Sequence, residues 1–160
     1  MITIEEIPKS HIGDFWALHW EYLNRDIFTP ADTEEDREYF RSGEYRGTME
    51  RYMDRVPDRA HLVYLAEDGV RIGCAQYIIY KSEDGKCFIL DFWVFPELRG
   101  GGTGHRCFDA LSRYALTDGC TYFEINVAGE RARRFWADVG FTDDGVDEYG
   151  LPLMRRSDIM

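Results

Sequence analysis

The sequence predicts a single-domain α/β (α+β) fold in which helices flank a mixed, mostly antiparallel central sheet. A chain of 160 residues is long enough for one domain with a sizeable core. Three β-rich runs follow one another between residues 61 and 95, and the short Glu-Asp-Gly turns between them favour antiparallel hairpins. Between residues 87 and 127, a strand, a glycine-rich turn, a helix and a strand form a βαβ unit. The two strands of such a unit should be parallel.

The first elements of the chain are predicted to be a strand and a helix. Residues 1–7 alternate apolar and polar side chains, which is typical of a short strand. Ser10 is well placed as the N-cap of a helix over residues 11–27, where large apolar side chains recur at helical spacing. A proline at position 30 then interrupts the pattern.

A second helical stretch is predicted over residues 34–56. Asp32 or Thr33 would cap it, and its acidic first turn suits the positive end of the helix dipole. We expect an interruption near Gly43 or Gly47, because glycine is a poor helix former.

The rest of the chain alternates between strand periodicity and helix periodicity, with turn residues at each boundary. In chain order we expect strands within 61–69, 70–85 and 86–95, a helix from about 103 to 117, a strand over 121–127, a short helix within 130–141, and two short strands around 147–149 and 151–156 that form a hairpin across Gly150.

Composition and charge exclude several classes of function. The net charge of -11 argues against a nucleic-acid partner, whose phosphates require a basic surface. It would suit a cationic partner such as an amine, although net charge bears on solubility before partners and an ordinary solvated surface is the simpler explanation. No apolar run is long enough for a membrane span, and the N-terminus does not resemble a signal peptide, so we expect a cytoplasmic protein. The four cysteines and four histidines show no metal-ligand spacing and no disulfide framework, so no metal is expected.

The segment RGGGTGH (residues 99–105) joins a predicted strand to a predicted helix. Three kinds of phosphate-binding loop place glycines at such a junction. A Walker A loop is excluded because its lysine is absent. A Rossmann fingerprint fails because its third glycine would fall on His105. The third kind cradles a pyrophosphate with backbone N–H groups at the helix N-terminus.

Two sequence blocks resemble those of the GNAT superfamily of N-acetyltransferases. Arg99, Gly102 and Gly104 fall on the defining positions of its acyl-CoA motif, R/Q-x-x-G-x-G/A, and Val94 and Pro96 match the usual lead-in. The second block resembles the region L-E-V-x-x-x-N-x-x-A-x-x-F-Y-x-x-x-G-F. Its matching residues are Phe123, Glu124, Ile125, Ala132, Phe135, Gly140 and Phe141.

The resemblance implies one N-acetyltransferase domain over residues 1–160, with a parallel strand pair that splays apart. It implies direct transfer of an acetyl group from acetyl-CoA, without a metal, to the amine of a small molecule or a peptide N-terminus. It leaves a homodimer open. The residues that would contact the cofactor are Phe92, Trp93, Val94, Arg99, Gly100, Gly101, Gly102, Thr103, Gly104, His105, Arg131 and Trp136.

For the catalytic groups, the resemblance leaves alternatives open. Asp91 and Glu124 are alternative general bases, since a carboxylate within an apolar strand is desolvated. The tyrosine that often protonates the thiolate in the family is Trp136 here, so either Tyr149 or Tyr122 replaces it or no acid is used. The family's asparagine is Gly129. These two departures keep an alternative open, a non-catalytic acyl-CoA-binding or ligand-sensing module.

Aromatic side chains near the first helix allow two interpretations. In the family, the first two helices and the last hairpin bound the acceptor site, so the aromatic residues of this helix would line it. A stripe at helical spacing is also the ordinary pattern of core packing. The residues concerned are Trp16, Trp20, Tyr22 and Phe28.

Overall fold

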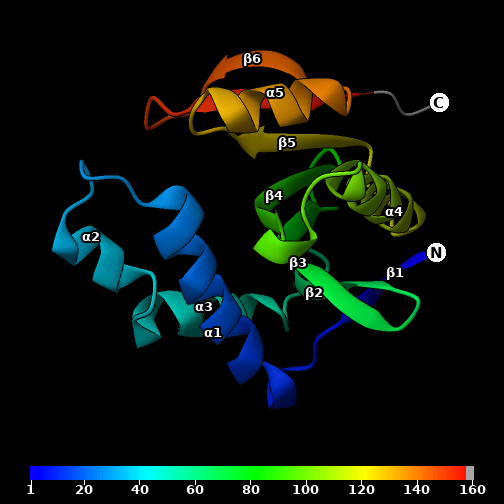
Figure 1. Cartoon of the computed structure of the whole chain (residues 1–160). Coiled ribbons are helices and arrows are strands. Elements are labelled where there is room, and N and C mark those ends of the chain that lie inside the picture. Colours follow the sequence, from blue (N-terminus) through cyan, green and yellow to red (C-terminus); the bar gives the residue numbers. More distant parts are fainter. Residues whose placement is uncertain (158–160) are drawn as a thin grey trace.

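The computed structural model describes residues 1–157, which form one seven-stranded sheet with helices on both faces (Figure 1). The strand order is β1-β2-β3-β4-β5-β7-β6, and all neighbouring pairs are antiparallel except β4 and β5. This confirms the predicted mixed sheet and its parallel pair. The strands are β1 Ile2–Glu6, β2 Ala60–Glu67, β3 Val70–Tyr80, β4 Lys86–Val94, β5 Tyr122–Asn126, β6 Thr142–Val146 and β7 Pro152–Arg156.

The helices divide between the two faces of the sheet. Phe108 of α4 and Trp136 of α5 belong to the hydrophobic cluster on one face, and Phe15 of α1 and Met49 of α3 belong to the cluster on the other. Within the described part of the chain, no helix is both long and apolar enough to cross a membrane. The helices are α1 Gly13–Tyr22, α2 Glu34–Tyr39, α3 Gly43–Tyr52, α4 Thr103–Thr117 and α5 Glu130–Asp138.

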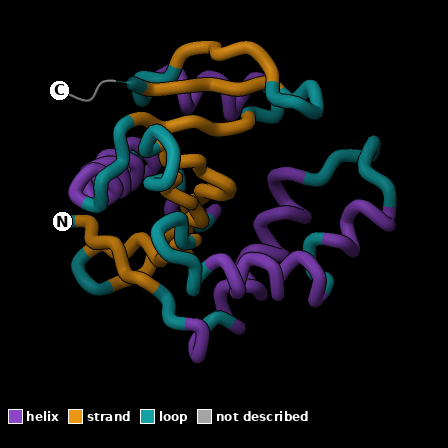
Figure 2. Tube along the Cα trace, turned by 180° about the vertical axis from the view of Figure 1, so that it is seen from behind, coloured by secondary structure: helices purple, strands orange, loops and turns teal. Residues whose placement is uncertain are grey.

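The sheet separates into two parts between β4 and β5. Strands β5, β7 and β6 form one group and β1 to β4 the other, and Figure 2 shows the two groups from behind. The parallel pairing of β4 with β5 runs only from Lys86 opposite Tyr122 to Ile89 opposite Ile125. The five remaining residues of β4 therefore continue without β5 beside them.

Helix α4 begins and ends at the predicted residues, 103 and 117. Its apolar residues recur at helical spacing and are buried, and Gly119 just past its end has a φ of +94°. The second helical stretch is interrupted as predicted, since α3 begins at Gly43, whereas Gly47 lies inside α3. Thr33, the second of the two suggested caps, accepts a hydrogen bond from the N–H of Asp36 at the start of α2.

The prediction that Ser10 caps the first helix is wrong. Ser10 lies in a 3₁₀ turn, Lys9–His11, and its hydroxyl contacts Nδ1 of His11 instead of a helix N–H. The N-cap of α1 is Ile12, which offers no side-chain cap. The 3₁₀ turn shifts the helix start by two residues, and a π-helical turn, Leu23–Ile27, continues the helix at its other end.

The final hairpin forms, but its first strand is not the predicted one. Residues 147–149 lie in the turn, and β6 is Thr142–Val146, with the sequence Thr-Asp-Asp-Gly-Val. Such a polar segment has low β-propensity and is fully exposed. Pairing with β7 stabilises it, from Thr142 opposite Arg155 to Val146 opposite Pro152.

The close approach of β3 to the end of β4 depends on Gly73. This residue belongs to β3 and lies opposite Val94 of β4. A Cβ atom on Gly73 would lie 2.4 Å from the carbonyl oxygen of Trp93 and 3.2 Å from Cα of Val94. Because both neighbours are backbone atoms, we expect Gly73→Ala to lower the free energy of unfolding by about 2 kcal/mol or more, measured by urea denaturation.

Gly13→Ala is the matched control for this prediction. Gly13 is the first residue of α1, and a Cβ there would meet nothing within 4 Å. Alanine should leave the stability unchanged or raise it by up to about 1 kcal/mol. Equal effects of the two substitutions would contradict the close approach of β3 to β4.

Candidate active site

The edge of β4 that faces β5 is open beyond Ile89. Gln76 of β3 lies opposite Asp91, whereas the next residue, Tyr77, lies opposite Ile89. Leu90 is therefore an extra residue, a β-bulge, which bends a strand and increases its twist. The bulge coincides with the point where β4 leaves β5.

Two backbone N–H groups point to this open edge. The N–H of Phe95 donates to the carbonyl of Ile72 at 2.9 Å, on the β3 side. Alternate residues of a strand direct their N–H groups to the same edge, so Trp93 also points to β3. Phe92 and Val94 then direct theirs to the open edge. Of Phe92, Trp93 and Val94, which are expected to contact the cofactor, only Phe92 and Val94 thus present a backbone N–H at the open edge.

The glycine-rich loop follows directly and is held in an unusual backbone conformation. Gly100, Gly101 and Gly102 have φ angles of +91°, +61° and +80°, which only glycine adopts readily. A Cβ on Gly100 or Gly101 would meet nothing within 4 Å, so this side of the loop is open. Gly102 is the N-cap of α4, and the helix dipole therefore adds a positive potential here.

The loop and the first turn of α4 present unpaired N–H donors. Among residues 1–157, the N–H groups of Gly101, Gly102, Gly104 and His105 have no acceptor. The N–H of Thr103 is used, since it and the Thr103 hydroxyl both donate to the carbonyl of Gly100, at 3.2 and 2.9 Å. Such a concave set of N–H groups at a helix N-terminus is suited to a phosphate or pyrophosphate.

Contacts behind the loop hold it in place. Arg106 donates to the carbonyl of Gly101 at 3.1 Å and pairs with Glu67 at 3.4 Å. A Cβ on Gly104 would lie 2.8 Å from Cε1 of Phe135, so glycine is required there for α4 to pack against α5. Gly104 therefore allows α4 to pack against α5, whereas Gly100 to Gly102 allow the positive φ angles of the loop.

Arg99 is occupied by two partners and ties the loop to the first helix. Its Nε donates to the carbonyl of Val94 at 2.8 Å, and its guanidinium forms a two-pronged contact with Asp26 at 2.6 and 3.3 Å. Asp26 lies in the π-helical turn after α1. No local sequence pattern indicates this partner, because 73 residues separate the pair. Through these contacts Arg99 joins the end of β4 and the start of the glycine loop to the segment after α1.

Asp91 lies on the face of β4 that packs against α1, in a buried polar network. It is 8% exposed, and its Oδ2 accepts a hydrogen bond from Nε2 of Gln76 at 2.8 Å. Nε2 of His19 lies 3.1 Å from the same oxygen. Gln76 Nε2 also donates to the hydroxyl of Tyr45 at 3.1 Å. Sequence reasoning missed His19 and Gln76, although each is a polar residue within an apolar segment.

Tyr22 covers Trp93 next to this network. The two rings are stacked, with centroids 4.4 Å apart and an interplanar angle of 6°. Burial raises the pKa of Tyr22 well above its ordinary value, and the carboxylates of Asp91 and Asp26 add to the rise. The Tyr22 hydroxyl is thus protonated at neutral pH.

The other aromatic residues expected near the acceptor divide between the two interpretations. Trp16 is buried in the core with Phe15, as the packing interpretation predicts. Trp20 and Phe28 are partly buried and pack edge to face at 5.9 Å, under the guanidinium groups of Arg41 and Arg37. Trp20 belongs to α1, and Phe28 directly follows the π-helical turn.

Glu124 lies on the neighbouring strand, before the point where the strands separate. It is opposite Phe88, and its Oε1 is 3.5 Å from Nζ of Lys86. Burial raises the pKa of Glu124, Lys86 opposes the rise, and a hydrogen bond with Asp144 adds to it. The carboxylate of Glu124 therefore interacts with Lys86 and Asp144, whereas Asp91 lies beside the open edge.

The remaining predicted site residues lie apart from the open edge or within the core. Tyr149 is in the β6–β7 turn and is 81% exposed. The hydroxyl of Tyr122 donates to Asp84 at 2.7 Å; burial and this contact raise the pKa of Tyr122 to about 12. Arg131 is exposed on the first turn of α5. Trp136 is 5% exposed and packs among the rings of Phe92, Phe108, Phe135 and Phe141.

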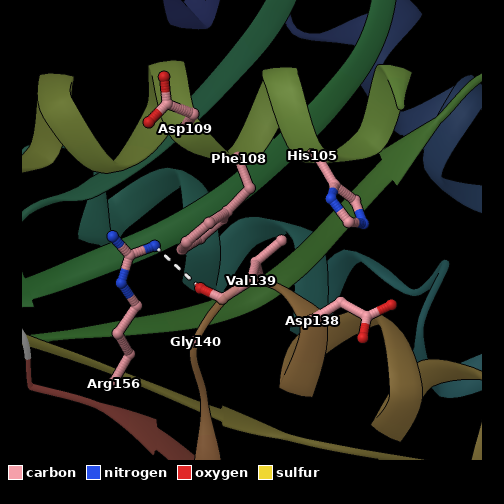
Figure 3. Close-up of a pocket in the computed structure, with 7 residues that line it drawn as sticks. All are labelled: His105, Phe108, Asp109, Asp138, Val139, Gly140 and Arg156. Carbon is pink, nitrogen blue, oxygen red and sulfur yellow. Dashed lines mark hydrogen bonds between the residues drawn. The ribbon is translucent and has the colours of Figure 1, made fainter. Parts of the chain in front are cut away.

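A hollow of about 440 Å³ lies between α4 and the end of α5 (Figure 3). Two carboxylates, Asp109 and Asp138, line it, and the guanidinium of Arg156 donates to the carbonyl of Val139 at 3.1 Å. His105 lies at its margin, and Phe108 projects into it (Figure 3). The hollow lies on the α4 face, opposite the network around Asp91, and acidic side chains flank it.

Within residues 1–157, no group of three or more His, Cys, Asp or Glu side chains is arranged to hold a metal ion. All four cysteines are buried as thiols. Two of them that are distant in sequence, Cys87 and Cys120, come together, and burial together with the Cys120 thiol raises the pKa of Cys87 well above its ordinary value.

Comparison with solved structures supports the fold at low sequence identity. The chain is similar to the PaiA N-acetyltransferase of Thermoplasma acidophilum, solved with coenzyme A, at 16% identity and a TM-score of 0.69, over 98% of this chain and 99% of that one. It is similar to a GNAT-family acetyltransferase of Staphylococcus aureus Mu50 at 11% identity and a TM-score of 0.68, over 98% and 99% of the two chains. At these identities the likeness establishes the fold alone.

A further similar structure is the aminoglycoside acetyltransferase AAC(6')-Ib, solved with coenzyme A and kanamycin. It shares 19% identity and a TM-score of 0.64, over 99% of this chain and 95% of that one. A sequence-family model, that of the acetyltransferase (GNAT) family, matches residues 16–141, which is more than half of the chain. The matched segment includes the β4 bulge, the glycine loop and α5. On this match, the chain belongs to the GNAT family of acetyltransferases.

Proposed function

We propose that residues 1–160 form one N-acetyltransferase domain, which transfers the acetyl group of acetyl-CoA directly to the amine of a small cationic molecule. The observation that carries the proposal is the adjacency of two sets of unpaired backbone donors. One set is the open edge of β4, at Phe92 and Val94, and the other is the loop from Gly101 to His105. A thioester carbonyl and a pyrophosphate belong to one donor molecule and need two such sites.

The donor would be held by backbone atoms. The N–H groups of Gly101, Gly102, Gly104 and His105 would surround the pyrophosphate, and the dipole of α4 favours its charge. The N–H of Phe92 or Val94 would donate to the thioester oxygen as it gains negative charge during attack. Coenzyme A in the structures of similar proteins supports this donor.

The acceptor side is suited to a cation. Asp91 lies on β4 and Asp26 lies in the π-helical turn after α1, in a chain with a net charge of -11. An acidic surface raises the local concentration of a cationic amine. The similar aminoglycoside acetyltransferase binds kanamycin, a small-molecule acceptor, which supports the same class here. A peptide N-terminus is the second acceptor class to be assayed.

Asp91 is the carboxylate that we propose as general base. The ammonium of the acceptor gives one proton to Asp91, and the freed lone pair attacks the carbonyl carbon of the thioester. The C–S bond breaks, the amide forms, and the second nitrogen proton ends on the coenzyme A thiolate through water. Thiols ionise near pH 8.5, so the thiolate leaves without a dedicated acid, consistent with Trp136 in place of a tyrosine.

A second candidate function is a non-catalytic acyl-CoA-binding or ligand-sensing module. The observation that favours it is the enclosure of Trp136 by four phenylalanine rings, which leaves no hydroxyl at this position. Release of free thiol distinguishes the two functions. The protein is mixed with acetyl-CoA and a panel of polyamines, aminoglycosides, amino acids and peptides. Thiol release with one class supports the enzyme, and coenzyme A binding without release for any class supports the sensor.

We also propose that the protein resides in the cytoplasm. All four cysteines are buried as thiols, and Cys87 and Cys120 are neighbours. Adjacent reduced thiols are typical of a reducing compartment.

Gly101→Ala tests the donor site. Its φ of +61° is disfavoured for alanine by about 1–2 kcal/mol, and the new Cβ would project into the open side of the loop. We expect the Kd for coenzyme A, measured by titration calorimetry, to rise by about tenfold or more.

Gly69→Ala is the control for this prediction, because it strains a turn elsewhere to a similar extent. Gly69 has a φ of +87° in the β2–β3 turn, with nothing within 4 Å of its Cβ. We expect it to lower stability without changing the affinity for coenzyme A. Unchanged affinity in Gly101→Ala as well would contradict the loop as the pyrophosphate site.

Asp91→Asn and Glu124→Gln separate the two carboxylates. If Asp91 is the base, Asp91→Asn should lower kcat/KM for the acceptor by about tenfold or more, since general-base catalysis typically contributes a larger factor. A loss with Glu124→Gln alone would instead assign the base to Glu124. Unchanged rates in both variants would contradict a carboxylate base.

A further inference from the structure

We infer that His19 is a positioning residue for the carboxylate of Asp91. Its Nε2–H and the amide of Gln76 both occupy Oδ2, which leaves Oδ1 as the oxygen that takes the proton of the acceptor amine. The inference rests on the proposed acyl transfer and adds two residues to it. Neither lies in the acyl-CoA motif or in the second conserved block.

Three elements bring these groups together. His19 comes from α1, Gln76 from β3 and Asp91 from β4, and the first two side chains are 1% and 0% exposed. The two donors reach the same oxygen at 3.1 and 2.8 Å. Oδ1 has no such donor among the described residues. The carboxylate therefore has one oxygen bound by the protein and one left for a substrate.

The surroundings determine the protonation state of His19. A carboxylate oxygen that accepts from Gln76 can only accept from the imidazole, so Nε2 carries the proton. Nδ1 is buried and has no partner among residues 1–157. A second proton there would be a buried donor without an acceptor, which is costly. We infer that His19 donates through Nε2 and holds Asp91, and is not itself the base.

Ring packing prevents the imidazole from rotating away. It lies nearly parallel to Phe15, at 6.0 Å and 15°, and to Tyr45, at 6.1 Å and 9°. Trp16 contacts it edge to face at 5.5 Å. Because three aromatic rings hold the imidazole of His19, it can donate to Oδ2 of Asp91 without a change of rotamer.

The groups that face Asp91 make a pH profile a readout of this carboxylate. Tyr22 from α1 and Tyr45 from α3 are the titratable side chains beside the pair, and burial, with the charge of Asp91, raises the pKa of both. Both hydroxyls therefore stay neutral at neutral pH. Asp26 and Arg99 lie beyond Tyr22 and form an ion pair with each other, so their opposite charges offset one another. A hydrogen bond to the charged form favours that form, so losing a donor moves the acidic limb of the profile to higher pH.

The test compares His19→Phe with His19→Gln, after an acceptor has been identified by thiol release. Phenylalanine keeps the ring packing and removes the donor, whereas glutamine keeps an N–H donor without a titratable ring. For His19→Phe we expect kcat/KM at pH 7 to fall by about tenfold, and the acidic limb to move up by about one pH unit. His19→Gln should recover most of the lost rate and the position of the limb.

His61→Phe is the matched control. His61 is equally buried, at 2% exposed, contacts Glu6 and Asp118 at 2.9 and 3.4 Å, and stacks on Tyr77, away from Asp91. Its loss should reduce stability and leave the pH profile unchanged. If both phenylalanine variants lose the same activity with no shift of the limb, His19 is merely structural and the inference is overturned. If His19→Phe does not fold, Gln76→Leu replaces it, with the same expected shift.

A measurement without an acceptor separates this inference from the proposed function. In ¹⁵N NMR spectra of the whole protein at pH 7, the ring of His19 should show a protonated Nε2 and a bare Nδ1. A ring protonated at Nδ1 overturns the inference whether or not acyl transfer occurs. Absence of transfer to every amine, with the expected ring state, contradicts the proposed function and leaves the pair itself intact.

Discussion

The structure depends on the bulge at Leu90, where β4 stops pairing with β5. A seven-stranded sheet would ordinarily satisfy every backbone donor in its interior strands, and an unpaired buried N–H costs about 1–3 kcal/mol. Here the parallel pairing ends at Ile89, and β4 continues to Val94 with β3 alone beside it. The bulge also changes the alternation of side chains, so that Asp91 and Trp93 face α1 while Phe92 faces α4 and α5. The same extra residue therefore opens the edge and directs the carboxylate.

Helix α1 and its π-helical extension connect the two sides of the open edge. His19 in α1 contacts Asp91, and Asp26 in the extension pairs with Arg99, whose Nε also holds the carbonyl of Val94. One continuous segment thus contacts the proposed base, the end of β4 and the arginine that begins the glycine loop. A π-helical turn is an uncommon element that often occurs at functional sites, and here it carries the residue that meets Arg99. A displacement of α1 would alter the donor side and the acceptor side together.

Local features were predictable from the sequence, and contacts across the sheet were not. The glycine loop, the bounds of α4 and the antiparallel order of β2 to β4 follow from backbone conformation and periodicity, which act within a few residues. The capping role assigned to Ser10 was wrong because a 3₁₀ turn delays the helix, and β6 was misplaced because only its pairing with β7 makes it a strand. His19 and Gln76 carried a weak signal, as polar residues in apolar segments. Their contacts with Asp91 could not be predicted from the sequence, because 72 and 15 residues separate them from it.

The central claim is that one ligand spans the open edge of β4 and the glycine loop. A titration of ¹⁵N-labelled protein with coenzyme A tests it most directly, because each backbone N–H reports separately. The account predicts that the amide signals of Val94, Gly101, Gly102 and Gly104 shift together and saturate with one affinity. It would be contradicted if those signals stayed unchanged while the residues around the hollow between α4 and α5, such as Asp138 and Gly140, shifted instead.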